Sequence, residues 1–81
     1  SDVYKRQLVL YLCSLTTGQC PEKQITGYMF ESHYDCALSG YAVSGQTYMH
    51  LAKDDYFGID RLNREKIAIK FHCQEMISPS D

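Results

Sequence analysis

The chain has 81 residues, of which 22% are charged, with 8 Lys and Arg against 10 Asp and Glu and a formal charge of -2 at pH 7. A chain of this length supports one domain with a thin hydrophobic core and is too short for two. The acidic balance argues against general nucleic-acid binding, which needs a basic surface to neutralise phosphates. No apolar run approaches the roughly 18 residues of a membrane-spanning helix. We therefore expect no nucleic-acid partner and no membrane partner.

The first residues of the chain resemble a translated sequencing adapter. The DNA sequence GATGTGTATAAGAGACAG, which transposon-based libraries carry, encodes the peptide Asp2-Val3-Tyr4-Lys5-Arg6-Gln7. We interpret residues 1–7 as an artefact and expect them to be disordered, followed by a single small α+β domain at residues 8–77 and a tail at residues 78–81. Without the adapter, Lys plus Arg falls from 8 to 6, Asp plus Glu falls from 10 to 9, and the charge moves from -2 to -3.

The first half of the domain is expected to form two strands. Residues 8–13 are an apolar run rich in β-formers, which predicts a buried central strand. Because small residues follow this run, a truncated secretory signal is the alternative interpretation. Gly18 and Pro21 then predict a turn. Residues 24–30 predict a second, weaker strand with a bulge or bend at Gly27.

A capping motif predicts the main helix at residues 34–53. The hydroxyl of Ser32 can accept a hydrogen bond from an amide of the first turn, and Asp35 can reach back. The polar side chains of this segment lie within one narrow arc of the helix, and the apolar arc is wider than one small sheet can cover. The side chains directly opposite the polar arc are Ala37, Tyr41, Ser44, Tyr48 and Leu51.

The rest of the chain completes the fold. Residues 54–64 predict a turn and a short second helix, and residues 66–75 alternate between apolar and polar side chains, which is the strongest strand pattern in the chain. A right-handed crossover through the main helix brings this last strand beside the first. The expected fold is α+β with the order β-β-α-β, in which a three-stranded antiparallel sheet of order 2-1-3 packs on one main helix.

Four cysteines are the most informative residues for chemistry: Cys13, Cys20, Cys36 and Cys73. The expected topology brings Cys13 close to Cys20 at one end of the sheet and Cys36 close to Cys73 at the other, so these are the disulfide candidates. Free thiols and a metal site are the alternatives, although the chain has no C-x-x-C and its spacings match no usual zinc motif. The location follows from the redox state, cytoplasmic if the thiols are free and periplasmic or extracellular if disulfides form.

No catalytic, cofactor-binding or metal-binding residue is assigned. The sharpest catalytic candidate is Cys36 as a thiolate near a helix start, with His33 one turn before it. The neighbouring Asp35 opposes thiolate formation, and no oxyanion donor can be named. His50 and His72 are expected on solvent-facing surfaces. We therefore expect neither an enzyme nor a bound cofactor.

Tyr34, Tyr41 and Tyr48 recur every seven residues and form a stripe along the expected helix. Base-stacking sites come with cationic neighbours, which this stripe lacks. Tyrosine combines an apolar ring with a hydroxyl that tolerates water, so it is favoured at protein interfaces. We interpret the stripe as core or interface, and the three tyrosines are the interface candidates.

Three stretches of the sequence form a recognisable pattern. They are Cys13-Ser14-Leu15-Thr16-Thr17-Gly18-Gln19-Cys20, then Ser32-His33-Tyr34-Asp35-Cys36-Ala37 with Gly40-Tyr41, and Ala68-Ile69-Lys70-Phe71-His72-Cys73. Together they resemble a group of small uncharacterised proteins from marine bacteria, their phages and ocean metagenomes, over most of residues 8–74. His72 stands where that group more often has an acidic residue. The resemblance implies no activity, substrate or site.

Two functions from different classes are consistent with these patterns. The first is a small non-enzymatic interaction or accessory module, of phage or marine bacterial origin, that binds an unknown protein partner or forms a homo-oligomer. The alternative is a thiol, redox or metal-binding protein that uses the four cysteines.

Overall fold

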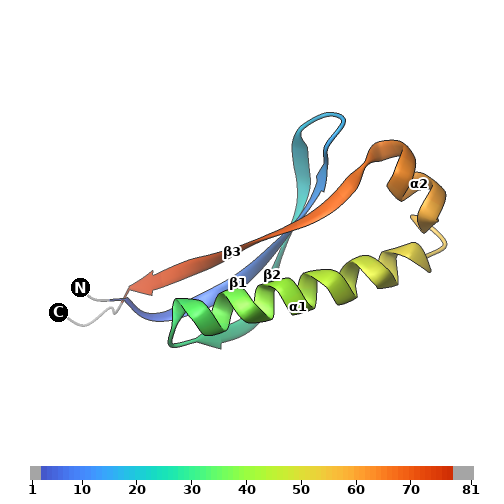
Figure 1. The fold of residues 1–81 in the computed structure, drawn as a ribbon. Coiled ribbons are helices and arrows are strands. Elements are labelled where there is room, and N and C mark those ends of the chain that lie inside the picture. The colour runs from blue at the N-terminus through green and yellow to red at the C-terminus, as the bar shows by residue number, and fades with distance from the viewer. Residues whose placement is uncertain (1–2, 78–81) are drawn as a thin grey trace.

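The computed structural model describes residues 3–77, which form a three-stranded sheet with one long helix along one face (Figure 1). The strands are antiparallel and lie in the order β2-β1-β3. The expected α+β fold, with sheet order 2-1-3 packed on one main helix, is confirmed. The elements in chain order are β1 (Val3–Ser14), β2 (Gln19–Phe30), α1 (His33–Ala52), α2 (Gly58–Glu65) and β3 (Ile67–Ile77).

The central strand β1 begins earlier than the sequence predicts. We expected order to begin at residue 8, but residues 3–7 belong to β1 and pair with the end of β3, where Lys5 lies opposite Met76 and Arg6 opposite Glu75. The expectation that residues 3–7 are disordered is therefore wrong. Pairing with β3 explains why the strand begins early. Main-chain hydrogen bonds to a neighbouring strand can hold polar residues such as Lys5 and Arg6 in a sheet. Residues 1–2 and the expected tail at 78–81 lie outside the described residues.

The β1–β2 hairpin is tighter than expected. β2 begins at Gln19 rather than at residue 24, since the chain reverses over four residues, with Gly18 at a φ of 75° and its amide donating to the carbonyl of Ser14 at 2.8 Å. The predicted irregularity at Gly27 is confirmed. Its φ is 84°, and the register of β1 against β2 shifts between Gln7 and Val9.

The main helix begins where the capping motif predicts. Ser32 is the N-cap, and its hydroxyl accepts a hydrogen bond from the amide of Asp35 at 3.1 Å. The face that meets the sheet is nevertheless rotated from the predicted one. The buried helical positions are Cys36 and Gly40, whereas Tyr41 is 71% exposed.

A small core explains this rotation. The buried side chains at its centre are Leu8, Leu10, Cys36 and Cys73, and Phe30, Val43, Ile69 and Phe71 pack against them. Gly40 lies directly on the ring of Phe71, so that a Cβ atom at this position would overlap the ring. The helix therefore turns its least bulky side toward β3, and its larger apolar side chains are left on the flank.

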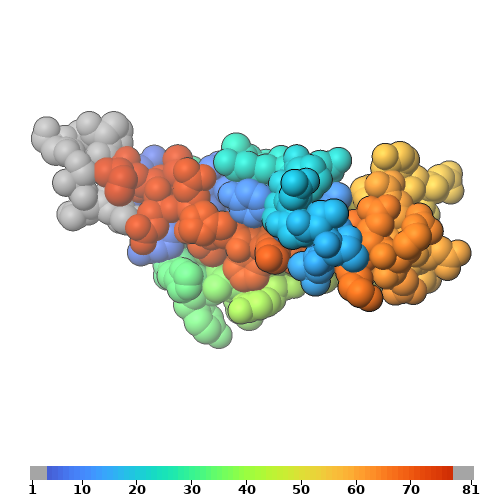
Figure 2. Space-filling view, turned by 90° about the horizontal axis from the view of Figure 1, so that it is seen from above, coloured from blue at the N-terminus to red at the C-terminus, as the bar shows by residue number. Residues whose placement is uncertain are grey.

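The domain is elongated rather than spherical. Its radius of gyration is 14.7 Å and its extents are 50 × 22 × 18 Å, whereas a compact chain of this length has a radius of gyration of about 12 Å. The tip of the β1–β2 hairpin rises away from α1, and α2 lies above the C-terminal end of α1, where it leads into β3 (Figure 1). Most of the sheet face opposite α1 is uncovered (Figure 2). The fold thus has a thin core and a large exposed surface.

The two glycines of α1 make a matched pair for testing the helix–sheet contact. Gly40→Ala is expected to destabilise the domain by about 2 kcal/mol, because the new methyl group overlaps Phe71 and must push α1 from β3. Gly45→Ala meets no atom within 4 Å and is expected to stabilise by about 1 kcal/mol through helix propensity. Denaturant unfolding of both variants measures the difference. Equal changes in the free energy of unfolding at the two positions would show that the close approach of Gly40 to Phe71 does not constrain the packing of α1 on β3.

Candidate interaction surface

The three predicted interface tyrosines lie on one flank of α1 and are exposed to solvent. Tyr34 and Tyr41 are each 71% exposed and Tyr48 is 36% exposed. Only Tyr41 makes an aromatic contact, with its ring edge-on to Phe71 of β3 at a centroid distance of 4.9 Å. Of the two expected roles for this stripe, core is wrong for these residues, and their exposure is compatible with an interface.

Other apolar side chains extend this flank. Leu38 and Met49 of α1 are 57% and 63% exposed and lie on the same side of the helix as the tyrosines. The prediction that one small sheet leaves part of the helix uncovered is confirmed. We call this surface the tyrosine flank, defined by Tyr34, Leu38, Tyr41, Tyr48 and Met49.

The neighbouring edge of the sheet is a long strand without Pro or a bulge. β3 runs from Ile67 to Ile77, and its pairing with β1 is regular from Lys5 to Ser14 of that strand. The opposite edge, β2, contains Pro21, Gly27 and two register shifts against β1. Pro and bulges are the usual means by which an edge strand is kept from pairing with another chain. The β3 edge has neither and is the edge that can accept a further strand.

A shallow groove separates the tyrosine flank from β3. It has a volume of about 400 Å³, and its walls are Ser44, Gly45 and Tyr48 of α1 with Ile67, Ala68 and Ile69 of β3. No wall residue is charged. The hydroxyl of Ser44 is buried and has no hydrogen-bond partner within the described part of the chain. The groove is thus an apolar surface with one unsatisfied polar atom.

Ser44 offers a test of that unsatisfied hydroxyl. A buried hydroxyl without a partner costs about 1 kcal/mol or more, so Ser44→Ala is expected to raise stability by about this amount beyond the gain from helix propensity. Ser39→Ala, at the polar side of the same helix, measures the propensity gain alone. Thermal unfolding of both variants gives the difference. A Ser44 variant less stable than the Ser39 variant would mean that the hydroxyl has a partner in solution.

The four cysteines pair as the topology predicted. Cys13 bonds to Cys20 across the β1–β2 hairpin, with the Cα atoms 3.9 Å apart, and Cys36 bonds to Cys73, with the Cα atoms 6.1 Å apart. Every cysteine of the described chain is bonded, and residues 3–77 contain no cluster of His, Cys, Asp and Glu with metal-binding geometry. Cys36, the sharpest catalytic candidate, carries no thiol in this state.

The histidines do not supplement the cysteines. His33, His50 and His72 are all exposed, and they lie on the first turn of α1, its last turn and β3 respectively.

A cluster around Arg61 of α2 is the clearest feature that the sequence did not reveal. The Arg61 guanidinium lies 4.5 Å from the ring centroid of Tyr56 and 4.8 Å from that of Phe57, and its Nε donates to Glu65 at 2.8 Å. Hydrogen bonds to Tyr56 and Glu65 hold the pKa of Arg61 above its usual value. The cluster remains charged at any physiological pH and fixes α2 to the turn before it.

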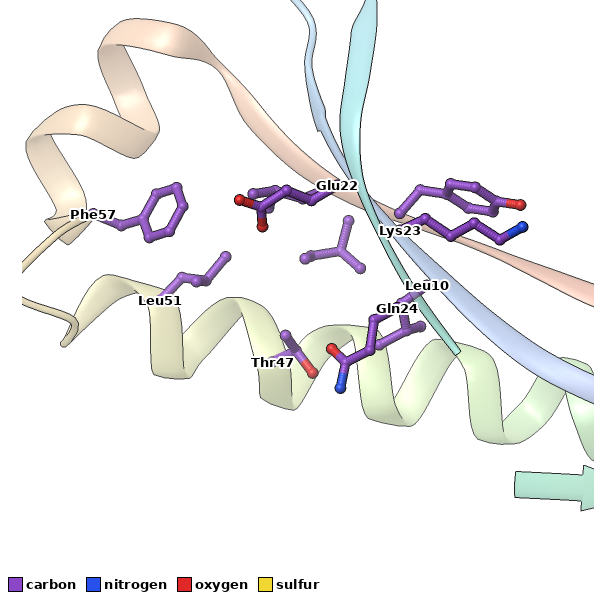
Figure 3. Close-up of a pocket in the computed structure, with 10 residues that line it drawn as sticks. Leu10, Glu22, Lys23, Gln24, Thr47, Leu51 and Phe57 are labelled. Carbon is purple, nitrogen blue, oxygen red and sulfur yellow. The ribbon is translucent and has the colours of Figure 1, made fainter. Parts of the chain in front are cut away.

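A second hollow lies between the sheet and the C-terminal half of α1 (Figure 3). It has a volume of about 150 Å³ and an apolar floor that includes Leu10, Leu51 and Phe57. Figure 3 shows Glu22, Gln24 and Thr47 at its margin, with Lys23 directed to the other side of the strand. Glu22 is the one carboxylate among the residues that line it.

Comparisons with known proteins do not assign the chain to a family. A scan against family models and searches of the curated proteins and of the solved structures found no match. Within residues 3–77, neither helix has the length and apolar character needed to cross a bilayer.

The two disulfides are expected to contribute unequally to stability. Replacing both Cys36 and Cys73 with Ala opens a link between residues 37 positions apart, and the chain-entropy model gives a loss of about 4 kcal/mol. Replacing both Cys13 and Cys20 opens a link between residues 7 positions apart, for a loss of about 2 kcal/mol. Urea unfolding of the two double variants compares them. A larger loss at the hairpin than at the helix would contradict this order.

Proposed function

We propose that the domain is a non-enzymatic interaction module that binds an extended segment of another protein along the β3 edge and the tyrosine flank. The observation that carries the proposal is the position of a regular edge strand, without Pro or a bulge, next to an exposed aromatic helix flank, with an apolar groove between them. An added strand would obtain main-chain hydrogen bonds from β3, and the groove would select its side chains.

The charges of β3 define the chemistry of that segment. Alternate residues of β3 face α1, and those between them, including Lys70 and His72, face away and are exposed. Opposite charges on neighbouring strands stabilise their pairing. A segment that alternates apolar with acidic residues would place its apolar side chains toward the groove and its carboxylates beside Lys70 and His72.

A second copy of the chain fits this surface less well. In a symmetric pair of β3 edges, the helix-facing side chains of the second β3, such as Ile69 and Phe71, would already be packed against their own α1. They would not be free to enter the groove. An extended segment has no such constraint, so we assign the surface to a different protein.

A designed peptide tests the proposal. An eight-residue peptide of alternating Val and Glu is expected to bind the domain and to shift the amide NMR signals of β3 and the tyrosine flank, whereas its Val and Lys counterpart is expected not to bind. Tyr48→Glu should weaken binding about tenfold or more, since it places a charge at the groove wall. Gln46→Glu adds the same charge on the opposite side of α1 and should leave affinity within about twofold.

Two outcomes would overturn the proposal. One is peptide binding that survives at full strength in a folded Tyr48→Glu variant. The other is a stable dimer, seen by sedimentation, that is lost in Tyr48→Glu and excludes the peptide, since this would assign the surface to self-association.

A different measurement tests the alternative function, which is thiol or metal chemistry on the four cysteines. Thiol titration of the native protein with and without reductant, together with metal analysis, should find no titratable thiol and no metal if the disulfides are permanent. Reactive thiols or a stoichiometric metal in the native protein would favour the cysteine-based function.

A further inference from the structure

The face of the sheet opposite α1 carries a pattern across all three strands, of which the proposed function uses only Lys70 and His72 at the β3 edge. Leu8, Leu10, Phe71 and Cys73 face α1 as part of the core, so the residues that alternate with them face away. Figure 2 looks onto this side, where all three strands are visible and α1 emerges only at the margin. We call it the open face.

Three strands contribute to one row at the middle of the open face. The register places Tyr11 of β1 opposite Lys23 of β2 on one side and opposite Lys70 of β3 on the other. Both lysines are exposed, and Tyr11 is partly exposed. Because neighbouring strands lie about 4.8 Å apart, the two strands that carry the lysines are separated by about 10 Å with the ring between them.

The next row adds an apolar and a basic group. Val9 of β1 lies between Ile25 of β2 and His72 of β3; Val9 itself is fully buried, whereas Ile25 is 58% exposed. Beyond the first row, the disulfide between Cys13 and Cys20 joins β1 to β2. The platform is therefore built on paired, cross-linked strands rather than on a loop.

Carboxylates are segregated from this face. The described parts of the strands contain two, Glu22 and Glu75, and both are paired with residues of the helix-facing side, Glu22 with Leu12 and Glu75 with Arg6. Figure 3 shows Glu22 and Lys23 directed to opposite sides of β2. Among the described strand residues, the open face thus carries no carboxylate and carries the amines of Lys23 and Lys70.

We propose that the open face binds single-stranded nucleic acid, with a base stacked on Tyr11 and phosphates beside Lys23 and Lys70. An aromatic ring flanked by amines on an exposed sheet is the arrangement that sequence-tolerant single-strand sites use. The net charge of -2 is an average over the whole molecule and does not describe this face. The site shares Lys70 with the β3 edge but also requires Tyr11 of β1 and Lys23 of β2, so it goes beyond the proposed function.

Fluorescence anisotropy with a labelled twelve-residue oligo-dT at low salt tests the proposal. Two phosphate contacts predict that the logarithm of affinity falls with the logarithm of salt concentration with a slope of about -1.4. Lys23→Glu and Lys70→Glu should each weaken binding about fivefold or more through repulsion of phosphate. Tyr11→Leu should weaken it about tenfold through the lost stack, whereas Tyr11→Phe should retain it.

Lys53→Glu is the matched control, because it makes the same change of charge at the C-cap of α1, away from the open face. Circular dichroism verifies that each variant is folded. Where a variant is not folded, the amide NMR shifts of the unsubstituted domain on addition of oligo-dT locate the contact instead. The proposal is overturned if Lys53→Glu weakens binding as much as Lys23→Glu, or if heparin binds equally well and without dependence on Tyr11. It is also overturned if oligo-dT fails to bind while vesicles containing phosphatidylserine do, which would assign the face to a lipid surface.

Discussion

The contact between α1 and β3 is the constraint on which the rest of this structure depends. Gly40 lies on the ring of Phe71, and the bond from Cys36 to Cys73 joins the same two elements one turn away. Together they determine both the distance and the rotation of the helix. Because the helix meets the sheet through its smallest residues, little apolar surface is buried per turn, and the large side chains remain on the flank. A thin core and an exposed tyrosine flank are two results of one contact.

This constraint also explains how much of the fold could be predicted from the sequence. Alternation in β3 and the capping motif at Ser32 follow from local patterns, the cysteine pairing follows from the strand order that they imply, and each has a direct counterpart in the structure. The rotation of α1 could not be predicted, because hydrophobicity marks Tyr41 as a core residue more strongly than it marks Gly40. The early start of β1 was missed for a similar reason. Residues 5–7 are polar, and pairing with β3, joined at Arg6 and Gln7 by pairing with β2, holds this segment in the sheet.

The candidate site was predictable in part. The tyrosine spacing identified three exposed residues of α1, since a repeat of seven marks one side of a helix. The groove beside them depends on Ser44, Ile67 and Ala68, which come from distant parts of the sequence and have no motif in common. The difference between the two sheet edges likewise appears only once the strand order is known. Pro21 has no meaning as a protective residue until β2 is seen to be an edge.

The distribution of charge over the two faces of the sheet is a further feature that the sequence alone does not predict. Glu22 and Lys23 are neighbours in the chain and cancel in any local sum, yet the pleat of β2 sends them to opposite faces. In β3 the same period of two separates Glu75 from Lys70 and His72. Because side chains alternate in direction along a strand, a sheet covered on one side can carry different charges on its two faces. Net charge predicts the partners of such a domain poorly, because a partner contacts one face, and here the exposed face of the strands is basic while the molecule as a whole is acidic.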